Sequence, residues 1–136
     1  MNSELTQVPT PEWMLSLFEA IDTLDTSESS GFQIFADDVV MQFGPQTVRG
    51  IEAVKQFFLT LDGPFITKHV VHKVFQFDRA FMMQGGATLH KKGEPKKASF
   101  SAAPLFNLFW FNETGLVSRY VVDFSPDLAK QSGLAG

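Results

Sequence analysis

The stretch FADDVVMQFGPQTVRGIEAVKQFF, residues 35–58, decides the fold. Within it, Val39–Phe43 is a short run of apolar and β-branched residues that predicts a strand, and Gly44-Pro45 then turns the chain. From Ile51 onward, apolar residues recur every three or four positions, which predicts a helix with one buried face. Asp62-Gly63-Pro64 ends this helix. The central unit is therefore a strand followed closely by an amphipathic helix.

Two further helices are predicted before this unit. Over residues 11–24 the apolar side chains stand at helical spacing, at Met14, Leu17, Phe18, Ile21 and Leu24. Residues 25–28 interrupt this pattern, and a second helix is predicted to run from there to about Ala36, with Phe32 and Phe35 facing the core. Residues 1–10 are polar, and we expect them to form a flexible N-terminus.

The rest of the chain is predicted to form four antiparallel strands, at residues 67–77, 80–91, 98–111 and 116–124. Gly85-Gly86, inside the second of them, indicates a bulge or a sharp bend. Helices at one end of the chain and hairpins at the other predict the α+β class, with helices packed on one face of a curved sheet. We expect one domain over residues 11–126 and a flexible C-terminal tail at 127–136.

The composition excludes several classes of protein. The chain has 136 residues, of which 15 are Phe, one is Tyr and none is Cys. This length allows one domain, and the lack of Cys excludes disulfides, thiolate metal sites and cysteine nucleophiles. A net charge of −4 argues against nucleic acid as a partner. The sequence shows neither a leader nor a membrane-spanning run, so we expect a soluble cytoplasmic protein without a membrane partner. So much Phe predicts a very aromatic core or an aromatic-lined cavity.

Residues 35–43 and 48–58 together resemble the nuclear transport factor 2-like superfamily, in particular its SnoaL-like branch. The resemblance extends over about residues 11–126. It implies a cone-shaped, cystatin-like α+β barrel, in which three N-terminal helices pack inside a curved, mixed and mostly antiparallel sheet. Between helices and sheet, the resemblance implies a deep apolar pocket. The fold hosts many unrelated functions, so it does not specify an activity.

Within this superfamily, the chain is similar to scytalone dehydratase and the fungal polyketide and terpenoid enzymes close to it. Thr67-Lys68-His69 resembles the Thr-Gln-His that opens a strand in that family, and Asn107-Leu108-Phe109-Trp110 resembles its Asn-Leu-His-Trp. His90 falls where the family has its second histidine, and Asp25 aligns with the aspartate that partners that histidine. The resemblance thus implies His69, His90, Asp25 and Asn107 as catalytic candidates.

Three positions depart from that family. Leu24 and Phe43 stand where the family has two pocket tyrosines, and Leu105 stands where it has a serine. The hydroxyls that hold and polarise the substrate carbonyl are therefore missing, which argues against scytalone itself as the substrate. We expect the substrate-binding wall to comprise Phe18, Leu24, Phe43, Phe58, Leu105 and Arg119.

Histidine suits proton transfer in such a pocket because its pKa lies near neutral pH. An aspartate bonded to one ring nitrogen leaves the other nitrogen free, and Asp25 with His90 is the predicted pair. The alternatives are that Asp25 caps a helix at the surface and that His90 is a solvated residue beside a turn. His69 and His72 lie three residues apart on one strand, so alternation puts them on opposite faces. The resemblance favours His69 inward, where a structural histidine is the alternative.

Asp123 and Arg119 share one face of the last strand. Related enzymes place an acid on this strand facing the cavity, where apolar surroundings would raise its pKa. The alternative for Asp123 and Arg119 is an ion pair between strands or at a dimer interface. Asn107 could donate to a developing oxyanion, or it could be a buried amide satisfied by its neighbours. Two histidines without a nearby carboxylate pattern are a weak metal signal, so we expect neither a metal nor an organic cofactor.

Three hypotheses for the function remain open. The first is a cofactor-free acid–base enzyme, a dehydratase, cyclase or isomerase, that acts on a hydrophobic polyketide- or terpenoid-like small molecule. The second is a protein that binds such a molecule without chemistry, favoured by the missing hydroxyls. The third is a protein–protein adaptor. A homo-oligomer, most simply a dimer, is expected through Phe106, Leu108 and Trp110 on one face of a strand.

Overall fold

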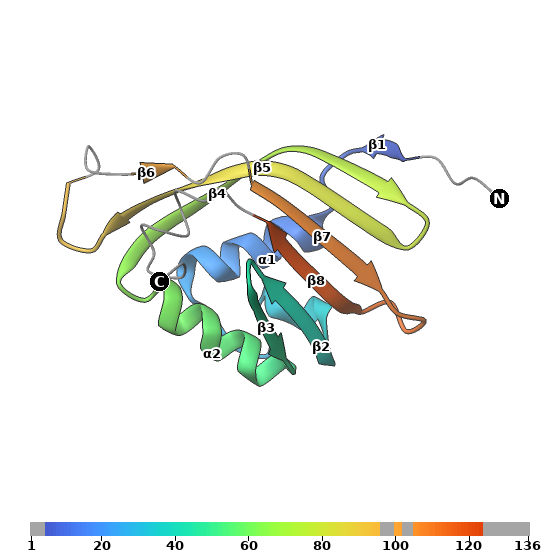
Figure 1. The fold of residues 1–136 in the computed structure, drawn as a ribbon, viewed down its shortest axis with the longest axis horizontal. Coiled ribbons are helices and arrows are strands. Elements are labelled where there is room, and N and C mark those ends of the chain that lie inside the picture. Colours follow the sequence, from blue (N-terminus) through green and yellow to red (C-terminus); the bar gives the residue numbers. More distant parts are fainter. Residues whose placement is uncertain (1–4, 96–99, 102–104, 124–136) are drawn as a thin grey trace.

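The computed structural model describes residues 5–95, 100–101 and 105–123. It is an α+β structure in which two α-helices, α1 (Glu12–Thr23) and α2 (Ile51–Asp62), pack beside a curved sheet (Figure 1). A 3₁₀ helix, η1 (Gly31–Ile34), follows α1. The strands are β1 (Thr6–Val8), β2 (Phe35–Phe43), β3 (Gln46–Arg49), β4 (Phe65–Phe77), β5 (Ala80–Lys91), β6 (Phe100–Ser101), β7 (Leu105–Phe111) and β8 (Val117–Asp123).

The strands form one sheet in the order β1-β4-β5-β7-β8-β2-β3, and β6 pairs with β5. β2 and β8 run parallel, whereas the other described pairs are antiparallel. The mixed, mostly antiparallel sheet expected from the resemblance is therefore confirmed. Figure 1 shows the long β4–β5 hairpin arching over the two helices, with β7 and β8 crossing beneath it. This curvature encloses the space in which the candidate site lies.

The prediction of a third helix over residues 25–36 is wrong. α1 ends at Thr23, the next residue, Leu24, takes a left-handed conformation with φ of 55°, and η1 is a single short turn. Before it, the Ser27 backbone N–H donates to Asp25 Oδ1, and the Phe32 N–H donates to Ser30 Oγ. Such side chain–backbone bonds compete with helix formation. Gly31 also lies against α1, where an added Cβ would stand 2.0 Å from the Ser16 carbonyl oxygen.

Strand positions agree closely with the sequence pattern in the second half of the chain. The 80–91 strand is found at its predicted bounds, and the 67–77 and 116–124 strands appear as β4 and β8. The predicted 98–111 strand is represented by β6 and β7, and its remaining residues lie outside the described ones. β1, which pairs with β4, and β3, which pairs with β2, were not anticipated. The proposed C-terminal tail, 127–136, also lies outside the described residues.

An irregularity in β4 faces the glycine pair of β5. The register between these strands shifts between Val71 and Lys73, directly opposite Gly85. A Cβ on Gly85 would stand 2.0 Å from the Val70 carbonyl oxygen, so the two backbones approach more closely than any side chain allows. The bulge expected at Gly85-Gly86 is therefore present, on the partner strand, and it contributes to the bend of the hairpin.

The core lies between the concave face of the sheet and the helices. α1 contributes Met14, Leu17 and Ile21, α2 contributes Val54 and Phe58, and the sheet contributes residues such as Met41 and Phe109. Trp13 packs edge-on against Phe81, Phe109 and Phe111, with ring centroids 5.0–5.5 Å apart. Much of the Phe content thus serves ordinary core packing. Within the described residues, neither helix has the length and apolar character needed to cross a membrane.

Candidate active site

An apolar cavity of about 50 Å³ lies between α2 and the concave face of the sheet. This volume holds roughly four water molecules. Its apolar walls are Phe43, Phe58, Leu61, Phe65, Ala87, Leu89, Leu105 and Val122. Its polar lining consists of Asp62, Thr67, His69, Asn107 and Tyr120. A few polar groups in apolar walls are typical of small-molecule sites.

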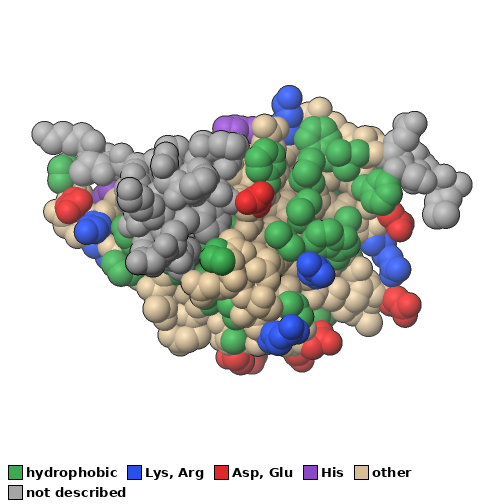
Figure 2. Space-filling view, viewed as in Figure 1, with side chains coloured by type: hydrophobic (Ala, Val, Ile, Leu, Met, Phe, Trp, Pro, Cys, Tyr) green, Lys and Arg blue, Asp and Glu red, His purple; other side chains and the backbone are tan. Residues whose placement is uncertain are grey.

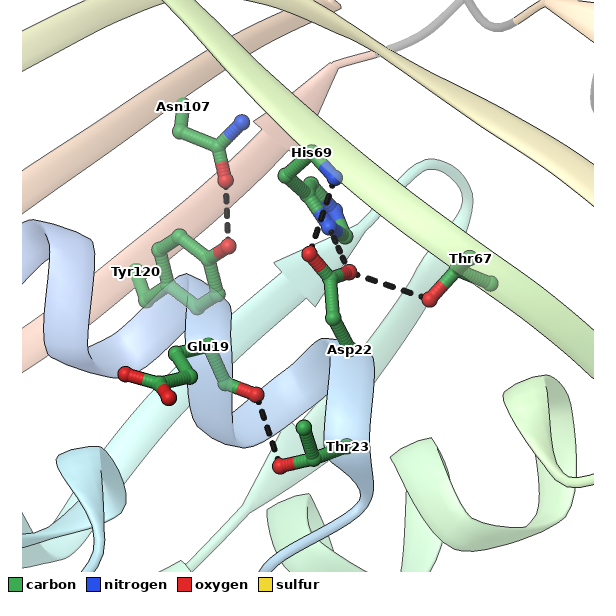
Figure 3. Close-up of polar contacts among 7 residues, drawn as sticks. All are labelled: Glu19, Asp22, Thr23, Thr67, His69, Asn107 and Tyr120. Atoms are coloured by element: carbon green, nitrogen blue, oxygen red, sulfur yellow. Dashed lines mark hydrogen bonds and ion pairs between the residues drawn. The ribbon is translucent and has the colours of Figure 1, made fainter.

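The C-terminal end of α1 and the inward face of β4 together hold one of these polar groups, His69. Asp22 Oδ1 accepts a hydrogen bond from the Nδ1–H of His69 at 2.6 Å, and Asp22 Oδ2 accepts one from the His69 backbone N–H at 2.9 Å (Figure 3). Thr67 Oγ1 donates to Asp22 Oδ1 at 3.0 Å. The carboxylate therefore accepts three hydrogen bonds from one segment of β4 and fixes the position of the imidazole.

Phe18 holds the other side of this ring. Its ring stacks on the imidazole with centroids 4.9 Å apart and planes inclined by 13°. Because Nδ1 donates to Asp22, the neutral imidazole has its lone pair on Nε2. No described residue makes a hydrogen bond to Nε2. His69 thus combines an oriented ring, a defined tautomer and a nitrogen available to a ligand.

Asn107 on β7 and Tyr120 on β8 form the second polar group. The Tyr120 hydroxyl donates to Asn107 Oδ1, and both side chains are fully buried (Figure 3). Burial raises the pKa of the Tyr120 phenol well above its usual range, so this hydroxyl remains a donor. Asn107 Nδ2 is buried and has no hydrogen-bond partner within the described part of the chain. Its N–H groups are consequently available to an acceptor atom in the cavity.

Asp62, the last residue of α2, is the third polar group and is 7% exposed. Burial raises the pKa of its carboxyl to about 6, and the charge of Asp22 acts in the same direction, while His69 opposes it. The described residues supply no hydrogen bond to this carboxyl group. Asp62 therefore differs from Asp22, whose carboxylate accepts three hydrogen bonds.

No protein-family model matches the sequence, and no curated protein matches it. Solved structures do. A hypothetical protein from Catenulispora acidiphila with a ketosteroid isomerase-like fold, in complex with trimethylamine, is 19% identical with a TM-score of 0.73, over 93% of this chain and 95% of that one. A protein of unknown function from Cytophaga hutchinsonii, described as nuclear transport factor 2-like, is 16% identical with a TM-score of 0.64, over 92% and 97%. The chain has the nuclear transport factor 2-like fold.

A putative SnoaL-like polyketide cyclase from Shewanella denitrificans has the same fold, with 13% identity, a TM-score of 0.72, and coverage of 92% of this chain and 96% of that one. The resemblance noted from residues 35–58 is thus confirmed for the fold and extends to a structure of the SnoaL-like kind. At these identities the likeness concerns the fold and not the activity. The closer similarity to scytalone dehydratase stays a prediction.

Within this nuclear transport factor 2-like fold, several of the residues predicted for the site do meet. His69 and Asn107 both line the cavity, together with Phe43, Phe58 and Leu105. Phe18 contacts His69 from α1. His72, three residues after His69, is exposed and lies at the β4 irregularity. The strand alternation and the bulge together explain why only the first of these histidines faces inward.

The predicted pair of Asp25 and His90 is not among the cavity residues. Asp25 lies at the surface, where its carboxylate accepts from the Ser27 backbone. His90 alternates with Leu89, which lines the cavity, and so has its side chain on the other side of β5. There it borders an open groove of about 570 Å³, which His69 also borders. The aspartate–histidine pair at the cavity is instead Asp22 with His69.

The face of β8 that carries Asp123 and Arg119 points away from the cavity. Both residues are exposed, whereas Tyr120 and Val122, which alternate with them, face inward. Arg119 lies over the Trp110 ring, with 5.5 Å from its guanidinium carbon to the ring centroid. The inward placement expected for Asp123 and Arg119 is therefore wrong. Leu24 is half-buried at the end of α1 and is likewise absent from the cavity wall.

Sequence reasoning missed Asp22, Asp62 and Tyr120. A signal for both acids was present: Asp22 follows Phe18 by four positions, and Asp62 follows Phe58 by four. A spacing of four places each carboxyl on the apolar face of its helix, beside a buried ring.

No three His, Asp or Glu side chains in residues 5–95, 100–101 and 105–123 come together as a group that could hold a metal ion.

Proposed function

We propose that this chain is an enzyme that performs acid–base chemistry on a hydrophobic small molecule without a metal or organic cofactor. The observation that carries the proposal is the Asp22–His69 pair, whose histidine is oriented on the wall of an apolar cavity. A base positioned in this way, on a largely apolar wall, suits removal of a proton from a substrate carbon.

His69 acts as the base in this proposal. Its Nε2 accepts the proton, and the Asp22 carboxylate stabilises the imidazolium that forms. The three hydrogen bonds to Asp22 and the stacked Phe18 ring reduce the rotation of the imidazole, which favours a single productive geometry. Asp22 is thus a positioning residue, because it acts through His69.

Asn107 recognises the substrate carbonyl in this proposal. Proton removal next to a carbonyl places negative charge on the carbonyl oxygen, and the unpartnered Nδ2 of Asn107 supplies donors to that oxygen. Tyr120, which occupies the other end of the amide, holds these donors toward the cavity. Dehydration, cyclisation and isomerisation of a polyketide- or terpenoid-like carbonyl compound all begin with this step. The fold shared with a putative polyketide cyclase is compatible with such chemistry.

Exchange of the α-protons of cyclohexanone for deuterium tests the proposal without knowledge of the natural substrate. We expect the protein in D₂O to accelerate this exchange, followed by proton NMR, and His69→Gln to lower the acceleration at least ~100-fold. His72→Gln is the matched control, because His72 is an exposed histidine on the same strand. Equal exchange by wild type and His69→Gln would refute the assignment of the base.

A binding protein without chemistry is the second candidate. Phe43 and Leu105 supply cavity walls without hydroxyls, and the Catenulispora protein of the same fold was solved in complex with a small organic molecule, trimethylamine. The same experiment separates the two candidates. Cyclohexanone that shifts the amide resonances of cavity residues but undergoes no accelerated exchange would favour binding over catalysis.

A further inference from the structure

We propose that Asp62 is a second catalytic residue, which delivers a proton to the leaving group of the substrate. The inference rests on the proposed function, in which His69 removes a proton, and it narrows the reaction to one that needs an acid as well as a base. The acid stands on α2 and the base on β4, so the substrate would lie between them.

The position of Asp62 supports this role. Its carboxyl lines the cavity, is almost completely buried, and receives no hydrogen bond from the described residues. A buried carboxylate that serves only structure normally accepts hydrogen bonds from its neighbours. Even the partly exposed Asp22 accepts three. A carboxyl without such donors keeps both oxygens available to a ligand.

The surroundings of Asp62 act on its pKa in opposite directions, and the net effect favours the protonated form. Asp22 from α1 adds a negative charge nearby, and Tyr120 from β8 is a neutral phenol. A positively charged His69 from β4 stabilises the Asp62 carboxylate. Burial has the largest effect, and together with the charges of His69 and Asp22 it raises the pKa of Asp62 to about 6. About half of the molecules therefore carry the acid at pH 6, and about a tenth at pH 7. The protonated acid is thus present in a substantial fraction of molecules near pH 6.

The reaction step balances without any further reagent. Nε2 of His69 takes the proton on the carbon next to the carbonyl, and the electrons of that C–H bond form the C=C bond of an enolate whose oxygen is held by Asn107. The electrons on the enolate oxygen then form the C=O bond again, the enolate C=C pair becomes the C=C bond between the α and β carbons, and the bond to the β-hydroxyl breaks with its electron pair on the leaving oxygen. The Asp62 carboxyl donates its proton to that hydroxyl, which leaves as water. His69 has gained one proton and Asp62 has lost one, and exchange with water restores both.

The substrate class that follows is a carbonyl compound with a hydroxyl at the β position. Hydroxide is a poor leaving group, so its departure requires a proton, whereas chloride departs without one. This difference gives a test in which the residue and the leaving group are varied together. The two probes are 3-hydroxycyclohexanone and 3-chlorocyclohexanone, which yield the same product, cyclohex-2-en-1-one, detected by its ultraviolet absorbance.

We expect Asp62→Asn to slow elimination from the hydroxy probe at least ~100-fold and to slow elimination from the chloro probe only a few-fold. His69→Gln should slow both to a similar extent. Asp38→Asn, at an exposed position of β2, is the matched control and should change neither rate. Circular dichroism verifies that each variant is folded.

The outcomes separate the two proposals. Equal loss on both probes in Asp62→Asn, or no loss on either, overturns the role of Asp62 and leaves His69 as the base. Failure of the wild type to eliminate either probe overturns the proposed function and this inference with it. If Asp62→Asn does not fold, the wild-type pH profiles decide. The ratio of hydroxy-probe to chloro-probe rates should fall about tenfold per pH unit above pH 6, and a constant ratio contradicts the proposal.

Discussion

Removal of the Asp22 carboxylate tests the central geometry of the site. Its oxygens accept from the His69 backbone N–H at 2.9 Å, from His69 Nδ1 at 2.6 Å and from Thr67 Oγ1 at 3.0 Å. A hydrogen bond to a charged group contributes about 1.5–3 kcal/mol. The three share one carboxylate that is 19% exposed, so their contributions are not additive. We expect Asp22→Ala to lower the free energy of unfolding by about 3 kcal/mol in total.

Asp22→Asn separates stability from chemistry. An asparagine can still accept one or two of these bonds, so the expected loss of stability is only about 1–2 kcal/mol. Its amide group, however, donates toward Nδ1 of His69, which moves the imidazole proton to Nε2 and removes the base. The accelerated exchange of cyclohexanone should therefore fall by about 10³–10⁴-fold.

Urea unfolding followed by tryptophan fluorescence measures the first quantity, and a loss of about 3 kcal/mol should lower the melting temperature by about 10 °C. Long-range nitrogen–proton NMR of the His69 ring reports the tautomer. Asp38→Ala, at an exposed carboxylate of β2, controls for the loss of one charge. A cost below about 1 kcal/mol for Asp22→Ala would show that Asp22 does not anchor β4. Undiminished exchange in Asp22→Asn would show that Asp22 does not orient His69.

Two other predictions concern stability and assembly. Because folding raises the pKa of Asp62 to about 6 from 3.8, the folded state binds the proton more tightly, and Asp62 destabilises the fold by about 3 kcal/mol above pH 6 but not below pH 4. Asp62→Asn should therefore exceed wild type in urea stability at pH 7.5 and lose this advantage by pH 4, and an advantage independent of pH would contradict the burial argument. The second concerns the outer sheet face, where hydrophobic side chains gather over β5, β7 and β8 (Figure 2) and Leu108 lies between Met82 and Val121. We expect a homodimer there, whose dissociation constant rises at least ~10-fold in Leu108→Glu by light scattering. Glu113→Gln in an exposed turn is the control, and a monomeric wild type would refute the dimer.

Local signals were sufficient for most of the architecture. The apolar spacing over residues 51–61 predicts α2, because it indicates one buried face. The strand-forming runs between residues 67 and 124, with the turns that separate them, predict the hairpins. The third helix failed because residues 25–30 are rich in Asp, Ser and Thr. Their side chains can satisfy the backbone in a turn as well as in a helix, and packing of Gly31 on α1 decided between the two.

The candidate site was predictable only in part. His69 and Asn107 were found because Thr67-Lys68-His69 and the segment that begins at Asn107 resemble motifs of the scytalone dehydratase family, and both residues line the cavity. On β8, alternation defines two faces but does not show which one lines the cavity. The prediction placed Arg119 and Asp123 inward, whereas both are exposed. Both missed acids follow a buried Phe by four positions, yet an acid at the edge of a helical apolar stripe is also common at a solvated boundary.

The sequence by itself determined the class, the helices α1 and α2, the hairpins of the second half and an aromatic interior, since these follow from composition and periodicity. The tertiary structure alone decided that Asp22, and not Asp25, meets a histidine. The reason is geometric. α1 ends at Thr23, so Asp22 lies within the helix and contacts β4. Asp25 lies beyond the helix end, in the loop that follows, where it accepts a hydrogen bond from the Ser27 backbone. Partners 47 residues apart, such as Asp22 and His69, meet only when the sheet curves over the helix. Burial of Asp62 likewise depends on the packing of α2 against the sheet, because the sequence around Asp62 does not show which other elements exclude water from its carboxyl group.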